Sequence, residues 1–283
     1  MKILAVDLGN FNVKTSENII FKSIYTTNEQ LSDEDEEVIV YDGIKYFMGK
    51  GNFDFEYNKT QKNYLPFLLY AIALSTDESA IDLVIGCPIS QFQLKDVYKD
   101  DLEGKTFRFY YNGESRKIFI NRLAVIPEGV SSFYTLSDSK RKNNDILIID
   151  IGGRTVNVSS FIKGKKDKTI TFPTGMLNLY STIFNRINVD GSYTIDKVER
   201  FINEGRITGT DKENNQFIKS IFNDLKLYIP NLTHYDVYFT GGGSKVLDNT
   251  IAKYSKANFN IMENPLFSNV IGNYNIAKAK WRE

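Results

Sequence analysis

The residues best suited to chemistry in this chain are two aspartates that end short apolar runs. Asp7 follows the run 3–6 and Asp150 follows the run 146–149, and a glycine comes two positions after each aspartate. Glycine tolerates positive φ, so successive backbone N–H groups in such a turn can point inward and bind an anion. An aspartate there can hold the water shell of Mg²⁺, which retains several waters alongside substrate phosphates. The pattern therefore indicates two phosphate-binding turns that together form a nucleotide clamp.

A triple glycine, Gly241 to Gly243, follows the apolar run 236–240 and precedes a predicted helix at 244–252. The N-terminus of a helix presents free N–H groups and a positive dipole end to an anion or a ribose phosphate. The chain has no Walker loop and no Gly-x-Gly-x-x-Gly motif after a strand. One Asp-x-Gly motif is weak evidence, but two copies and a later triple glycine are far more specific.

The composition excludes several classes of protein. A single cysteine, Cys87, and a single histidine, His234, exclude an intramolecular disulfide framework, a multi-cysteine zinc site and a histidine-rich metal centre. Catalysis would have to use carboxylates, Lys or Arg, hydroxyls, backbone amides or a metal held by oxygen. With 35 basic and 35 acidic residues the net charge is zero, which argues against a protein that coats nucleic acid and permits self-association. No apolar run is long enough for a signal peptide or a membrane span, so we expect a cytoplasmic protein.

The elements that must position these turns are predicted from hydrophobic periodicity and turn residues. Strands are expected at 3–7, 82–88, 123–126, 146–150 and 236–240, with hairpins at 38–47 and 107–120. Helices are expected at 60–76, 175–186, 195–204, 212–228 and 276–281, and a further helix is expected to begin at Glu128. The polar run 138–144 predicts a loop and the boundary between two domains. Residues 3–9 align with 146–152 at seven positions, which indicates two similar lobes.

These motifs resemble those of the actin/Hsp70/sugar-kinase ATPase superfamily. Residues 7–14 and 150–155 resemble the two phosphate motifs of this superfamily. Residues 126–129 and about 270–273 resemble its two connecting motifs, and residues 239–243 resemble its adenosine motif. Residues 12–14 and 126–128 are most similar to bacterial actins of the ParM/Alp plasmid-segregation type. The chain departs from the pattern at Asn157, where many relatives carry Asp, and at Arg154, which replaces a small residue.

The resemblance implies an α/β, actin-like (ribonuclease H-like) duplicated fold with two lobes around a nucleotide cleft and reduced outer subdomains. The first lobe would span 1–140, with an outer subdomain at about 22–60 and a C-terminal helix, 273–283, packing back on it. The second lobe would span 141–272, with an outer subdomain at about 181–231.

The resemblance also implies the site residues and cofactors. Glu128 would orient the attacking water, although a glutamate in the first turn of a helix also serves capping electrostatics. Asp7 and Asp150 would complete the catalytic group by holding Mg²⁺ through water. Lys14 would reach the β- and γ-phosphates, although a lysine on a strand is more often a surface residue. The nucleotide, ATP or GTP, would also contact Gly9, Asn10, Phe11, Asn12, Gly152, Gly153, Arg154, Thr155, Gly175, Glu199, Gly241, Gly242 and Gly243.

The function implied by the resemblance is an ATPase that polymerises into filaments. Such filaments move plasmid DNA through a DNA-binding adaptor protein, so no direct contact with DNA and no membrane are expected. Two alternatives share the fold: a nucleotide-dependent regulator that does not polymerise, and a small-molecule kinase. A kinase would need an acceptor-activating aspartate and a sugar cleft, and the sequence shows no clear one.

Overall fold

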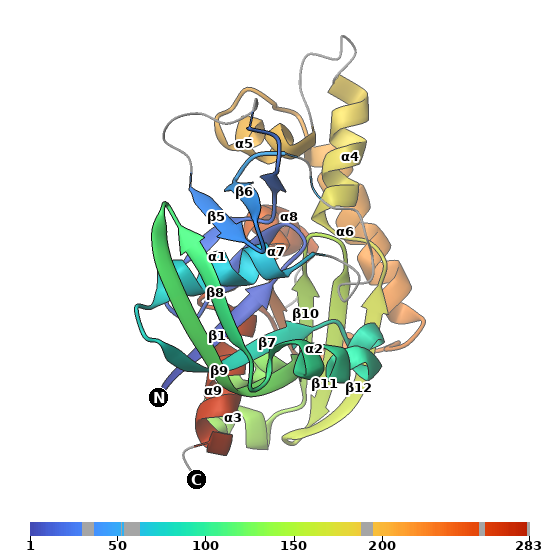
Figure 1. Cartoon of the computed structure of the whole chain (residues 1–283). Coiled ribbons are helices and arrows are strands. Elements are labelled where there is room, and N and C mark those ends of the chain that lie inside the picture. Colours follow the sequence, from blue (N-terminus) through green and yellow to red (C-terminus); the bar gives the residue numbers. More distant parts are fainter. Residues whose placement is uncertain (30–36, 52, 54–62, 188–194, 255–257, 282–283) are drawn as a thin grey trace. The chain divides into compact units, whose positions relative to one another are not determined.

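The structure of the chain is a computed structural model that describes residues 1–29, 37–51, 53, 63–187, 195–254 and 258–281 (Figure 1). The chain divides into two compact units, which we call unit 1, Met1–Thr135 with Phe267–Glu283, and unit 2, Leu136–Leu266. Residues 30–36, 52, 54–60 and 188–194, which fall in the two predicted outer subdomains, lie outside the described residues.

Unit 1 is built on a nine-stranded sheet in the order β3-β2-β1-β7-β9-β8-β5-β6-β4, counted over the described residues. Strands β1, β7 and β9 are parallel, and β2 pairs with β1 in the antiparallel sense. The strands are β1 Lys2–Leu8, β2 Asn12–Thr15, β3 Ile20–Lys22, β4 Tyr25–Thr26, β5 Val38–Tyr41, β6 Ile44–Met48, β7 Ala80–Cys87, β8 Thr106–Tyr111 and β9 Glu114–Pro127. The helices are α1 Leu65–Ser75, α2 Lys95–Leu102 and α9 Ser268–Trp281, with 3₁₀ turns at Ile89–Leu94 and Ser131–Thr135.

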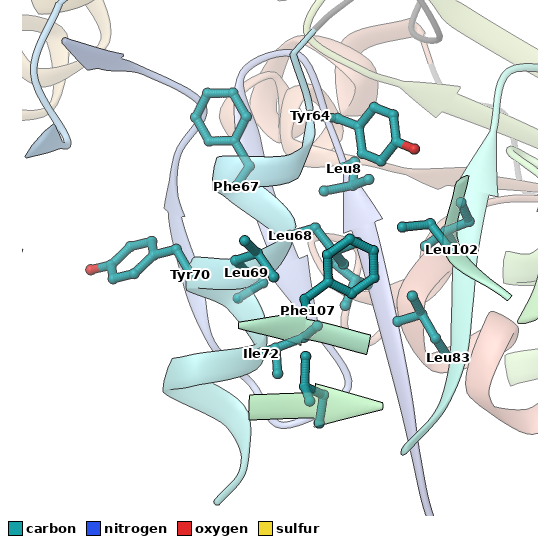
Figure 2. Packing of buried hydrophobic residues seen from close by; sticks show 14 of the residues in the cluster. Leu8, Tyr64, Phe67, Leu68, Leu69, Tyr70, Ile72, Leu83, Leu102 and Phe107 are labelled. Carbon is teal, nitrogen blue, oxygen red and sulfur yellow. The ribbon is translucent and has the colours of Figure 1, made fainter. Parts of the chain in front are cut away.

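Strand β1 is buried on both faces, which explains why its sequence is a continuous apolar run. Leu4, Val6 and Leu8 pack in the cluster that contains α1, whereas Ile3 and Ala5 pack in a second cluster with α9. Figure 2 shows the first cluster, in which leucines and aromatic rings of α1 meet side chains from the strands. The α1 and α9 helices therefore cover opposite faces of the sheet and fix the strand that ends on Asp7.

Unit 2 has a five-stranded sheet in the order β12-β11-β10-β13-β14, counted over the described residues. Its strands are β10 Ile146–Ile151, β11 Val156–Ile162, β12 Lys165–Phe172, β13 Asp236–Thr240 and β14 Phe259–Ile261. Its helices are α3 Asp138–Asn143, α4 Met176–Ile187, α5 Val198–Asn203, α6 Asp211–Lys226, α7 Gly242–Val246 and α8 Asp248–Tyr254, with 3₁₀ turns at Ile195–Lys197 and Leu232–His234.

The two sheets share one arrangement around their central strands. In unit 1 the strand β1 lies between antiparallel β2 and parallel β7, and in unit 2 the strand β10 lies between antiparallel β11 and parallel β13. Asp7 is opposite Lys14 across the first pair, and Asp150 is opposite Asn157 across the second, with the same separation along the chain. The predicted α/β duplicated fold is confirmed.

Three predictions of secondary structure are wrong for identifiable reasons. Glu128 does not begin a helix, because Gly129 has a φ of 73° and residues 128–130 form a turn. The run 138–144 is mostly the helix α3, since Ser137 caps its N-terminus and basic side chains lie in its last turn. The C-terminal helix begins at Ser268 rather than at 276 and includes Gly272, which lies where α9 crosses Ser131–Thr135. Within the described residues, no helix combines the length and the apolar character that a membrane span requires.

The buried carboxylate of Asp82 on β7 supports a prediction about stability. Arg122 donates hydrogen bonds to both of its oxygens, at 3.1 and 2.5 Å, and Asn121 donates another at 2.8 Å. The hydrogen bond from Arg122 holds the pKa of Asp82 below its usual range, although burial opposes this effect. A lowered folded-state pKa contributes stability above the unfolded pKa, near 4, and this contribution is lost as the pH falls through the folded-state pKa.

We therefore expect Asp82→Asn to lower the free energy of unfolding by about 1.5–3 kcal/mol at pH 7 and by much less at pH 3. Urea unfolding at the two pH values measures this difference. Asp77→Asn is the matched control, because Asp77 pairs with Arg116 but its side chain is 99% exposed. We expect the Asp77→Asn variant to lower the free energy of unfolding by less than about 1 kcal/mol. An equal loss from Asp82→Asn at both pH values would contradict the assignment.

Candidate functional site

The first aspartate turn holds a largely buried pair of opposite charges. Lys14 Nζ lies 3.3 Å from Asp7 Oδ2, and the two side chains are only 13% and 10% exposed. Their contact follows from the register of β1 and β2, in which they face each other. A Cβ atom on Gly9 would overlap the carbonyl oxygen of Asn12, so this hairpin turn closes only with glycine. The turn thus presents an ammonium group beside a glycine loop, as a phosphate site requires.

The neighbouring residues of this turn differ in what they offer to a ligand. The ring of Phe11 is buried, stacks on Phe53 at 4.9 Å and lies 3.7 Å below the ammonium group of Lys22. Its side chain therefore belongs to the packing of unit 1, and what it can offer to a nucleotide is its backbone. Asn10 and Asn12 are half-buried, and Asn12 begins β2.

Glu128 lies in the turn after β9, where its N–H donates to the carbonyl oxygen of Cys87 at 2.8 Å. A Cβ atom built on Gly86 would lie 3.3 Å from Glu128 Cγ and 3.6 Å from both Glu128 Oε1 and Asn273 Nδ2. Gly86 therefore leaves the space in which the Glu128 carboxyl group lies. The motifs at 126–129 and about 270–273 did not predict that Gly86 and Asn273 lie beside Glu128, because β7, the turn and α9 are far apart in sequence and periodicity cannot show that they meet.

The second aspartate turn is closed by contacts within unit 2. Asp150 is buried at the end of β10, and Gly152 N–H donates to Thr155 carbonyl oxygen at 2.9 Å. A Cβ atom on Gly175 would lie only 2.6 Å from the carbonyl oxygen of Gly153. The structure therefore brings Gly152, Gly153 and Gly175 together, as the prediction of a common site requires. Met176 and Leu177, at the start of α4, donate their N–H groups to Gly152 and Gly153.

The triple glycine lies beside the same aspartate. Gly241 has a φ of 83°, and a Cβ atom there would overlap Asp150 Oδ1. The helix predicted from residue 244 begins earlier, at Gly242, so Gly242 and Gly243 form the first turn of α7. Gly243 is a packing position, because a Cβ atom there would overlap Ile151. Asp150 and the N-terminus of α7 thus form one polar corner.

The remaining residues predicted to contact the nucleotide in unit 2 are Arg154, Thr155 and Glu199. Arg154 and Thr155 are half-buried in the turn between β10 and β11, and Thr155 accepts a hydrogen bond from Asn157 at 3.3 Å. Glu199 lies on α5, where it accepts a hydrogen bond from the hydroxyl of Tyr180 at 3.5 Å. Burial and the charge of Glu199 raise the pKa of Tyr180 above its usual value. The role proposed for Glu199 at the nucleotide stays a prediction.

The contact between Gly241 and Asp150 supports a prediction about nucleotide affinity. Gly241→Ala should displace the Asp150 carboxylate and lower the affinity for nucleotide by roughly tenfold or more, measured by calorimetry. Gly209→Ala is the matched control, because Gly209 also has a positive φ, 68°, but has no atom within 4 Å of the added methyl group. Both variants place an alanine at a positive φ, where the backbone of a residue with a side chain is strained. Equal losses of affinity would therefore show that strain alone is responsible.

Comparisons with known proteins identify the fold of this chain. Residues 5–130 match the family model described as the N-terminal domain of actin-like proteins. No curated protein matches the chain. Among solved structures, the archaeal actin homolog Ta0583 in complex with ADP has a TM-score of 0.83 at 18% identity, covering 99% of this chain and 100% of that one.

Two filament structures are also similar. A 15-stranded ParM filament from Clostridium botulinum has a TM-score of 0.81 at 21% identity, covering 99% of this chain and 100% of that one. The AlfA filament bound to AMPPNP has a TM-score of 0.68 at 18% identity, covering 100% of this chain and 98% of that one. The chain therefore has the actin-like fold of the ParM and Alp proteins, and its match to the N-terminal domain of actin-like proteins contains Asp7, Lys14 and Glu128.

Proposed function

We propose that the chain is a cytoplasmic ATPase that binds ATP with Mg²⁺ and polymerises into filaments. We propose further that the filaments segregate plasmid DNA through a DNA-binding adaptor protein. The observation that carries the ATPase proposal is the buried Asp7–Lys14 pair beside the Gly9 turn. A lysine that is held in this way places its ammonium group next to a loop of backbone N–H groups, where phosphate oxygens can bind.

Each of the two turns supplies a carboxylate of the kind that a hydrated Mg²⁺ ion prefers. Asp7 and Asp150 are buried carboxylates at the ends of equivalent strands, and Mg²⁺ prefers such oxygen ligands together with retained water. When bound, the ion would neutralise charge on the β- and γ-phosphates. In this proposal Lys14 binds the same phosphates, Gly241 and the first turn of α7 lie against the ribose or an α-phosphate, and Glu128 orients the attacking water.

The similar structures support self-association and nucleotide binding as parts of the proposal. One of them is a complex with ADP, another is a filament bound to AMPPNP, and a third is a multistranded filament. The absence of net charge agrees with a protein that stacks on copies of itself and contacts DNA through another protein.

Sedimentation and phosphate release test this proposal directly. We expect the protein to pellet in the presence of ATP and Mg²⁺, to stay in the supernatant without nucleotide, and to release phosphate with no added acceptor. Negative-stain images of the pellet should show filaments. Phosphate release without pelleting would instead support a regulator that does not polymerise, and turnover that requires a small-molecule acceptor would support a kinase. Parallel reactions with GTP determine the nucleotide preference.

A further inference from the structure

Three residues from distant parts of unit 1 lie close together in the structure. Gly86 lies near the end of β7, Glu128 lies in the turn after β9, and Asn273 lies on α9. Glu128 Oε1 and Asn273 Nδ2 are each 3.6 Å from the same point above the Gly86 Cα atom. The amide of Asn273 and the carboxyl group of Glu128, to which the proposed function gives the attacking water, therefore both border the space that Gly86 leaves open.

The position of Asn273 is fixed by the way α9 packs. Ser131 donates a hydrogen bond to Asn269 at 3.3 Å, and Asn275 donates one to the carbonyl oxygen of Tyr134 at 3.2 Å. Gly272 crosses the 3₁₀ turn so closely that a Cβ atom would overlap the carbonyl oxygen of Ser131. These contacts hold α9 against the residues that follow Glu128, so Asn273 and Glu128 are held in one local framework.

Asn273 is a buried polar side chain whose hydrogen-bonding capacity is only partly used. It is 1% exposed, and its Oδ1 atom is buried without a hydrogen-bond partner within the part of the chain that the structure describes. A buried amide without a partner costs stability, and an apolar side chain of the same size would avoid that cost. Such a group calls for an explanation outside simple packing, such as a bound water or a functional role.

We infer that Asn273 is a positioning residue for Glu128: its amide donates from Nδ2 to the carboxylate, across the space left by Gly86, while Oδ1 accepts from an internal water. This inference rests on the proposed ATPase function. Asparagine suits the role because it supplies a donor without adding charge, whereas an aspartate would repel the carboxylate. Glycine at position 86 suits it because a methyl group there would press on Glu128 Cγ at 3.3 Å.

The first test is independent of ATP hydrolysis. In protein labelled with ¹⁵N at asparagine and studied without nucleotide, Asn273→Leu identifies the side-chain amide signal of Asn273 by its loss. We expect Glu128→Ala to move that signal and to leave the signal of Asn275 in place, because Asn275 lies on the same helix but bonds to Tyr134. An Asn273 signal that does not move would overturn the inference, whether or not the wild-type protein hydrolyses ATP.

The second test separates positioning from stability. Asn273→Leu should lower kcat for phosphate release by roughly 10- to 100-fold with little change in KM, since it disturbs the orientation of Glu128 rather than nucleotide binding. In the Glu128→Ala background the same substitution should have no further effect on kcat. Equal fold losses in both backgrounds would overturn the inference.

Two further variants guard against loss of folding. Asn275→Ala removes a hydrogen bond from the same helix and should leave kcat unchanged. Gly86→Ala disturbs Glu128 from the opposite side and should reproduce the loss of kcat seen in Asn273→Leu. A wild-type protein that releases no phosphate would contradict the proposed function, and the labelling experiment would then still decide this inference.

Discussion

Glu128→Ala is expected to bind ATP and to assemble normally but to release phosphate about 10²- to 10⁴-fold more slowly than the wild type. The carboxyl group lies in the space that Gly86 leaves open. In the proposed function, its removal takes away the group that orients the attacking water and leaves in place the residues of the two turns proposed to bind phosphate. Single-turnover phosphate release and sedimentation with ATP measure the two effects separately.

Glu114→Ala is the control for this experiment. Glu114 is an exposed glutamate at the start of β9, within the same unit. It should hydrolyse ATP at the wild-type rate, which shows that losing a carboxylate from unit 1 is harmless in itself. Wild-type turnover in Glu128→Ala would remove Glu128 from the mechanism and would leave nucleotide binding by the two turns as a separate question.

The central strands could be predicted because each is buried on both faces. Residues 3–6 and 146–149 are continuous apolar runs, and such runs are what parallel strands between two helical layers require. The duplication could also be predicted, because both copies combine this apolar run with Asp and Gly at matching positions. The elements that were missed depend on local details, such as the positive φ of Gly129 and the cap of Ser137 on α3.

The site could be predicted only where it is local in sequence. The Gly9 and Gly152 turns each lie within one hairpin, so motif spacing was enough to find them. Asn273 borders the space beside Gly86 that Glu128 also borders only because α9 packs on β1 and β7, far from both in sequence. Phe11 shows the converse, because its place in a binding motif did not reveal that its ring stacks on Phe53.

Lys14→Met is the substitution with the largest expected effect on both stability and nucleotide binding. It leaves Asp7 as a buried carboxylate without its partner, and breaking such a pair typically costs about 3–5 kcal/mol. It also removes the cation proposed to bind the β- and γ-phosphates, and a lost charged hydrogen bond of about 1.5–3 kcal/mol lowers ATP affinity by roughly 10- to 100-fold. Urea unfolding without nucleotide and calorimetric titration with ATP measure the two effects.

The double variant Asp7→Asn/Lys14→Met separates the two roles of the lysine. It removes both charges together, so no buried carboxylate lacks its partner, and much of the lost unfolding free energy should return. ATP affinity should stay low, because the phosphates still lack the ammonium group. Lys45→Met, which breaks an exposed pair with Glu29, should change neither property by more than about 1 kcal/mol. If ATP affinity recovered together with stability in the double variant, Lys14 would serve only to neutralise Asp7, and the phosphates would be bound by the backbone of the Gly9 turn.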